Sequence, residues 1–132
     1  MVPQPDYPYP EFEYLDFTYS SFGKPEIKSA TIRVPVRDFL VVTGFTGYEH
    51  DVFYKRGVLA FTNVFRSQRR LFELVAPGSK EFKPSYTITD GPFPEVNQKL
   101  FLFYLGGPMD DPPGWIEWYI LAPSVQVEDA ER

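Results

Sequence analysis

Hydrophobic and polar residues alternate along much of this chain with a period close to two. Residues 30–36 place alanine, isoleucine and two valines at every second position, with threonine, arginine and proline between them. This pattern is typical of a half-buried strand, whose successive side chains point to opposite faces of a sheet. Pro35 has no N–H to donate, so we expect it at a sheet edge, at a bulge or near the strand end.

Five further segments have the composition of strands and are separated by turn residues. They cover residues 39–43, 58–65, 86–89, 100–105 and 115–121. Residues 67–76 fit either a strand or a short helix, and we favour a strand because residues 65–68 suit a hairpin connection. Residues 100–105 and 115–121 are apolar at both alternating sets of positions, which predicts that they pair as central strands buried on two sides.

The connection between these two segments, residues 106–114, has the sequence Gly-Gly-Pro-Met-Asp-Asp-Pro-Pro-Gly. We expect a rigid loop rather than a tight turn, because the prolines fix its path and the glycines permit close approach. Asp110 and Asp111 would lie at its tip. They could hold a cation, but adjacent carboxylates usually point apart, and the simpler interpretation is that both face solvent in a turn.

About seven short strands predict an all-β, mainly antiparallel domain, either a β-sandwich or a partly open barrel, with at most one short helix. A chain of 132 residues is expected to form one domain, and we assign residues 12–123 to it. Residues 1–11 are rich in proline and tyrosine, which predicts an extended arm whose tyrosines pack on the domain. Residues 124–132 end in charged residues, which predicts a flexible tail.

Composition excludes several classes of function. The chain has a formal net charge of −5, so it lacks the positive field that attracts nucleic acids or anionic membranes, and we expect neither as a partner. It has no cysteine and a single histidine, and it shows no phosphate-binding loop or zinc-binding pattern. We therefore expect no cofactor and no metal. No secretory signal is visible at the N-terminus, which favours a cytoplasmic protein.

Aromatic residues are the main indication of a binding surface, because the chain has 13 phenylalanines, nine tyrosines and two tryptophans. Along residues 115–121, the alternation places Trp115, Glu117 and Tyr119 on one face and Trp118 on the other. We expect Trp118 in the core. The other three are candidates for a surface site that anchors a protein or stacks on a sugar.

Two further groups of side chains are candidates for binding. Arg66, Arg69 and Arg70 are close in the sequence and predict a positive patch on an acidic chain, which either binds an acidic partner or solubilises a hairpin end. Asp110 and Asp111 are the second group. A catalytic alternative would use His50 with neighbouring acids, but no nucleophile stands in a recognisable motif, and we assign no catalytic residue.

The leading interpretation is a non-enzymatic binding or protein-interaction module, whose partner is another protein or a second copy in a homodimer. Residues 57–64 resemble strands of small bacterial β-rich domains, some of which are toxin-immunity proteins. That resemblance, together with the acidic charge, implies a module that blocks a basic enzyme. The first alternative is a small-molecule or carbohydrate-binding domain with an aromatic-lined cleft. The second is a small hydrolase or metal-dependent enzyme that uses His50.

Overall fold

The computed structural model describes residue 5 and residues 9–131 and shows one highly curved sheet of ten strands. The strands are β1 (Leu15–Asp16), β2 (Ser21–Phe22), β3 (Glu26–Lys28), β4 (Thr31–Val41), β5 (Val52–Thr62), β6 (Arg66–Glu73), β7 (Tyr86–Asp90), β8 (Phe101–Asp110), β9 (Pro113–Ala122) and β10 (Ser124–Glu131). A 3₁₀ turn, η1 (Phe12–Tyr14), precedes them. The prediction of an all-β, mainly antiparallel fold is confirmed.

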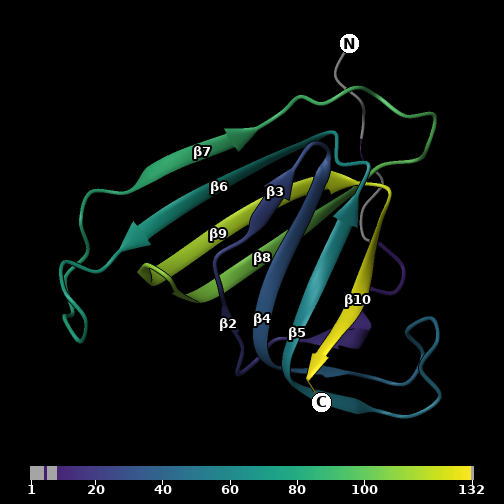
Figure 1. The fold of residues 1–132 in the computed structure, drawn as a ribbon, viewed down its shortest axis with the longest axis horizontal. Helices are drawn as coiled ribbons and strands as arrows, with labels where there is room; N and C mark the ends of the chain where they lie inside the picture. The colour runs from purple at the N-terminus through teal and green to yellow at the C-terminus, as the bar shows by residue number, and fades with distance from the viewer. Residues whose placement is uncertain (1–4, 6–8, 132) are drawn as a thin grey trace.

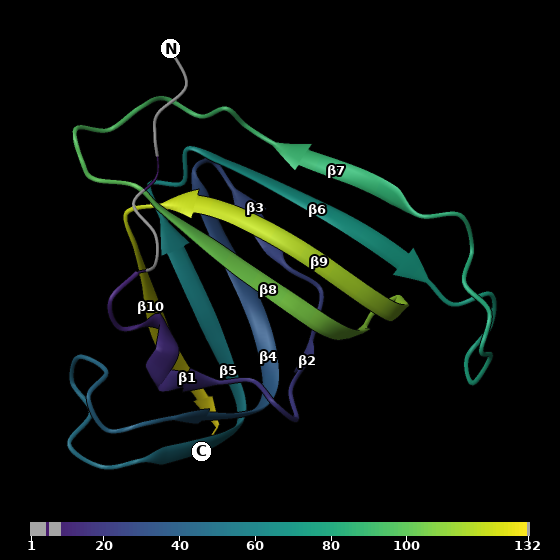
Figure 2. The ribbon, with the colours of Figure 1, turned by 180° about the vertical axis from the view of Figure 1, so that it is seen from behind.

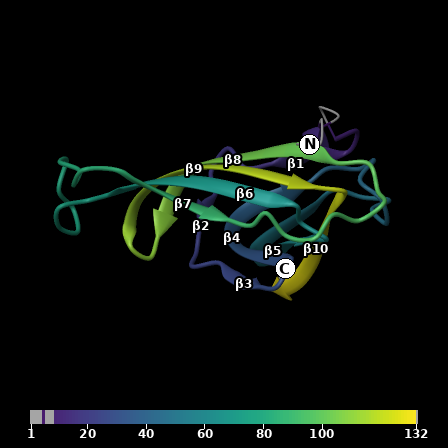
Figure 3. The ribbon, with the colours of Figure 1, turned by 90° about the horizontal axis from the view of Figure 1, so that it is seen from above.

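The sheet folds into two layers that cross at an angle, as Figures 1 and 2 show from opposite sides. The β4 layer consists of β10, β5 and β4, and the β9 layer consists of β8, β9, β6 and β7. Figure 3 shows the two layers one above the other, with the far end of β6 extending past the β4 layer. Strand β2 joins the layers, because it pairs with β4 and, through one parallel bridge between Phe22 and Met109, with β8.

The core lies between the two layers and is built by the alternation seen in the sequence. In β4, Ile32, Val34 and Val36 are at most 1% exposed, and they face Trp118 and Ile120 of β9, which are equally buried. The predicted core position of Trp118 is confirmed. Strands β8 and β9 pair along their whole length, as predicted for residues 100–105 and 115–121.

Aromatic rings connect the two layers through this core. Phe103 of β8 contacts Phe61 of β5 with ring centroids 5.1 Å apart. It also contacts Tyr9 and Phe12 from the N-terminal segment, at 5.1 and 5.2 Å. A second group of ring contacts is centred on Phe17, which touches Phe12, Phe22 and Phe39, and Phe39 in turn stacks on Tyr54. The rings fill the space that aliphatic side chains would leave open between two diverging layers.

Pro35 lies in the middle of β4 and not near its end. Its carbonyl accepts a hydrogen bond of 2.8 Å from the N–H of Gly23. The nitrogen and the carbonyl of one residue point to the same edge of an antiparallel strand, so the nitrogen of Pro35, which has no hydrogen to donate, also points toward Gly23. That direction is the break between β2 and β3, where no strand continues the ladder. The sheet is therefore interrupted beside Pro35, and no ladder hydrogen bond is lost.

The predicted rigid loop over residues 106–114 is wrong. Strand β8 continues to Asp110, β9 begins at Pro113, and a two-residue turn joins them. One glycine needed here is Gly107, which has φ of 152° and whose added Cβ would lie 3.2 Å from the ring of Phe22. The absence of a side chain at Gly107 thus lets Phe22 of β2 pack against β8. Gly107 is needed for this packing and not for a loop.

Both chain ends differ from the expectation in part. Residues 124–131 form β10, which pairs with β5 from Ser124 opposite Thr62 onward, so the sheet continues past residue 123. Val125 is 3% exposed and faces the core. Of the predicted N-terminal arm, residues 1–4 and 6–8 lie outside the described part of the chain, and Tyr9 packs on Phe101 and Phe103. The ambiguous residues 67–76 are largely strand, in β6.

Replacing Gly57 with alanine is expected to destabilise the protein by about 1–3 kcal/mol through overpacking. A Cβ at this position would lie 2.7 Å from Cε1 of Phe39, and that ring cannot move freely because it is buried and stacked on Tyr54 at 5.0 Å. Chemical denaturation of Gly57→Ala, Phe39→Leu and the double variant measures the effect. In the double variant the smaller leucine side chain should relieve the clash, so additive losses would contradict this account.

Candidate functional site

The outer side of the β9 layer, which faces away from the core, carries an aromatic surface. We call it the outer aromatic face and define it by Tyr104, Trp115, Tyr119, Phe72 and Phe82. Four of these side chains are 40–51% exposed, and Phe72 is partly buried. The prediction that β8 and β9 are buried on two sides is therefore wrong, because their outward rings face solvent. Trp115 and Tyr119 lie at the surface, as expected from the alternation.

Tyr104 and Tyr119 form one end of this face. They are cross-strand partners in β8 and β9, and their ring centroids are 5.0 Å apart at an angle of 48°. The Tyr104 ring lies over Gly106, where any Cβ would collide with it. A glycine beneath an aromatic ring lets the ring cover the backbone and lie along the sheet. The tyrosine pair is thus held close to the sheet and forms a low platform.

Trp115, Phe72 and Phe82 form the other end. Trp115 and Phe72 are cross-strand partners in β9 and β6, and Phe82 from the β6–β7 connection contacts Phe72 edge-on at 6.4 Å. These three rings and Glu117 line a hollow of about 390 Å³. The sequence analysis did not select Phe72 or Phe82. The alternation of residues 68, 70 and 72 in β6 could have identified Phe72, but Phe82 depends on how its connection folds back.

A glutamate and an arginine lie between the two aromatic ends. Glu117 and Arg70 are cross-strand partners, and together with Tyr119 they line a second hollow of about 350 Å³. The guanidinium of Arg70 lies 5.3 Å from the ring centroid of Phe72 and donates a hydrogen bond of 3.1 Å to Ser85. The outer aromatic face therefore has one basic and one acidic side chain at its centre.

The three predicted arginines do not form one patch. Arg66 and Arg70 point to the outer side of β6, because they pair with Leu121 and Glu117, outward positions of β9. Arg69 points to the inner side, and its guanidinium carbon lies 5.1 Å from the ring centroid of Trp118. Adjacent residues of a strand point to opposite sides of the sheet. Arg69 and Arg70 are neighbours in the sequence, but their side chains therefore lie on different faces.

Asp110 and Asp111 do not converge on a cation site. Asp110 accepts two hydrogen bonds of 3.0 Å from Arg37 and one of 3.1 Å from Ser21, so its carboxylate links β8 to β4 and β2. Asp111 lies in the turn that follows. Among the described residues, no group of three or more His, Cys, Asp or Glu side chains is arranged to hold a metal ion.

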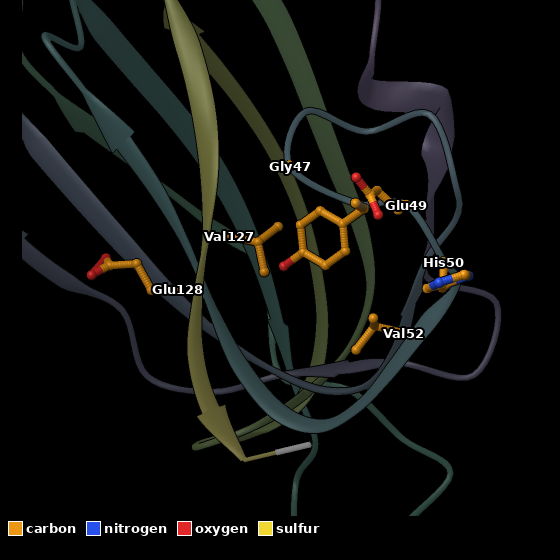
Figure 4. Close-up of a pocket in the computed structure, with 7 residues that line it drawn as sticks. Gly47, Glu49, His50, Val52, Val127 and Glu128 are labelled. Carbon is orange, nitrogen blue, oxygen red and sulfur yellow. The ribbon is translucent and has the colours of Figure 1, made fainter.

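His50 lies in the β4–β5 connection beside a hollow of about 650 Å³, drawn in Figure 4. Val127 and Glu128 of β10 also line it, but their side chains point to opposite sides of that strand (Figure 4). The neighbouring Asp51 carboxylate accepts hydrogen bonds of 2.8 Å from the N–H and the hydroxyl of Thr43, which lower its pKa below the ordinary value. Asp51 thus acts as a structural acceptor for the connection.

The comparisons with known proteins assign no relative to this architecture. No family model matches the chain, and no curated protein or solved structure matches it significantly. The described residues contain no helix of the length and apolarity needed to span a bilayer. The resemblance of residues 57–64 to strands of small bacterial domains and the cytoplasmic location both stay predictions.

The pKa values of two tyrosines on opposite sides of the sheet, Tyr104 on the outer aromatic face and Tyr86 opposite the inward-facing Leu71, should each depend on a different acidic neighbour. Burial and then the Glu117 charge raise the pKa of Tyr104, whereas burial and then a hydrogen bond of 3.0 Å to Glu73 raise the pKa of Tyr86. Glu117→Gln should lower the pKa of Tyr104 and leave that of Tyr86 unchanged, and Glu73→Gln should do the reverse. Alkaline titration followed by ¹³C NMR of ring-labelled tyrosine measures both. A common response to either substitution would argue against this arrangement.

Proposed function

We propose that this protein is a non-enzymatic interaction module that pairs with a second copy of itself through the outer aromatic face. The observation that carries the proposal is the exposure of Tyr104, Trp115, Tyr119 and Phe82, each at 40–51%, on one contiguous side of the β9 layer. Large exposed apolar patches on soluble proteins usually mark interaction sites. A second layer placed against these rings would bury them as a sandwich core does.

The composition of the face supports a protein partner over a small ligand. Tyrosine, tryptophan, phenylalanine and arginine are the residues enriched at the centres of protein interfaces, and this face combines all four. Small-ligand sites are usually single concave pockets, whereas these side chains spread over three strands and line two separate shallow hollows. The arrangement therefore favours an extended contact.

The charges at its centre favour a second copy over a basic partner such as the target of an immunity protein. Arg70 and Glu117 stand side by side, so the centre of the face carries one charge of each sign. In a two-fold contact the same surface is used twice, and Arg70 of one copy can meet Glu117 of the other. A partner selected for its positive charge would instead require an excess of acidic side chains on this face.

Charge substitutions at the centre should disrupt the dimer and then restore it in a mixture. Arg70→Glu places two acids, and Glu117→Arg two bases, on the face of each copy, so each variant alone should dimerise at least about tenfold more weakly. An equimolar mixture of the two should form a heterodimer, because opposite charges then meet. Sedimentation velocity over a range of concentrations measures all three.

Lys55→Glu is the matched control for Arg70→Glu, because it makes the same change of charge at an exposed position of β5 in the other layer. It should leave the sedimentation of the protein unchanged. A wild-type chain that stays monomeric at high micromolar concentration would disprove the proposal. Failure of the mixture to associate, with both variants folded, would place the contact elsewhere.

A further inference from the structure

A second site lies between the layers, at the open side where β6 and β7 pass the β2–β3 connection. Arg69 enters it from the inner face of β6, and Lys24 and Asp111 reach it from the opposite walls. Leu71 and Ile88 complete an apolar lining around a hollow of about 240 Å³. We call this hollow the Arg69 mouth. It lies on the inner side of β6 and is separated from the outer aromatic face by the sheet itself.

Two buried hydrogen-bond donors have no acceptor, one on Arg69, which lines the mouth, and one on its neighbour Trp118. Among the described residues, the buried side-chain nitrogens without a hydrogen-bond partner are Nε of Arg69 and Nε1 of Trp118. The two residues are cross-strand partners in β6 and β9, and the guanidinium carbon lies 5.1 Å from the indole centroid. Asp90 forms an ion pair with Arg69, but its Oδ2 is 4.0 Å from Nε, which is too far for a hydrogen bond.

Unsatisfied donors are costly in such a position, because the side chain of Arg69 is 13% exposed and Trp118 is 1% exposed. Burial lowers the pKa of the Arg69 guanidinium, while the charges of Asp90 and Tyr86 oppose that shift. The guanidinium stays charged at any physiological pH. The guanidinium of Arg69 is thus a largely buried cation whose Nε–H has no acceptor. A guanidinium can bind a planar anion with two parallel hydrogen bonds, one from Nε and one from a terminal nitrogen.

We propose that the Arg69 mouth binds a small-molecule carboxylate with an apolar body, whose carboxylate pairs with the guanidinium of Arg69. A carboxylate fits better than a phosphate, because Asp90 and Asp111 already place negative charge nearby and would repel a doubly charged group. Leu71 and Ile88 suit an apolar body. The small volume of the mouth limits that body to about one ring.

Fluorescence of Trp118 tests the proposal directly. Trp115→Phe removes the other tryptophan and leaves Trp118 as the single indole of the chain. In this background, benzoate at neutral pH should change the emission saturably, and benzamide, its neutral analogue, should not. Arg69→Met should weaken benzoate binding at least about tenfold, and Arg69→Lys should weaken it less. Arg66→Met is the matched control, since it removes a charge from the outer side of the same strand, opposite Leu121, and should leave binding unchanged.

Circular dichroism and thermal unfolding establish that each variant is folded. Should Arg69→Met not fold, the wild-type chain still decides the matter through the ¹⁵N–¹H signals of arginine Nε, where benzoate should shift Arg69 and leave Arg70 in place. Equal binding of benzamide, preference for inorganic phosphate, or equal weakening by Arg69→Met and Arg66→Met would overturn the proposal. None of these outcomes depends on self-association, because the two sites lie on opposite sides of the sheet.

Discussion

The fold depends on contacts that hold two crossed layers together, because almost no backbone hydrogen bonds connect one layer to the other. In the described residues, β2 and β8 share one bridge, between Phe22 and Met109. Two other interactions secure the junction. Ring contacts centred on Phe103 join the layers through the core, and the paired hydrogen bonds from Arg37 to Asp110 join them at the surface. The Arg37–Asp110 pair is exposed and contributes little stability alone, so the buried rings provide most of the cohesion.

Both candidate sites follow from this bend. Because the β9 layer is covered on one side, its other side presents alternate residues of three strands to solvent, and those residues are the outer aromatic face. The β4 layer does not extend as far as the far end of β6 (Figure 3). A hollow lined by Arg69 lies between the layers. A flat sandwich with layers of equal size would have covered Arg69 and left no mouth.

The sequence predicted the features that depend on neighbours along the chain. Alternation placed Trp118 in the core and Trp115 and Tyr119 at the surface, since these positions follow from one strand alone. It failed where a distant contact decides the outcome. Gly107 looks like a loop glycine until Phe22 is placed against it, and the charged end of β10 looks like a tail until Glu128 meets Arg33 at 2.7 Å. The inward position of Arg69 could not be predicted without the register of β6 on β9, which places Arg69 and Arg70 on opposite faces.

The order of the strands has a consequence for biosynthesis. Tyr9 and Phe12 leave the ribosome early, but their partner Phe103 is made near the end of the chain, and β5 gains its second neighbour when β10 is complete. The nascent polypeptide must therefore carry unpaired strands and uncovered rings until β8 and β10 have been made. Topologies with such distant pairings fold slowly, and their intermediates are prone to aggregate. The interval between the synthesis of β5 and that of β10 is therefore when this chain is most exposed to aggregation.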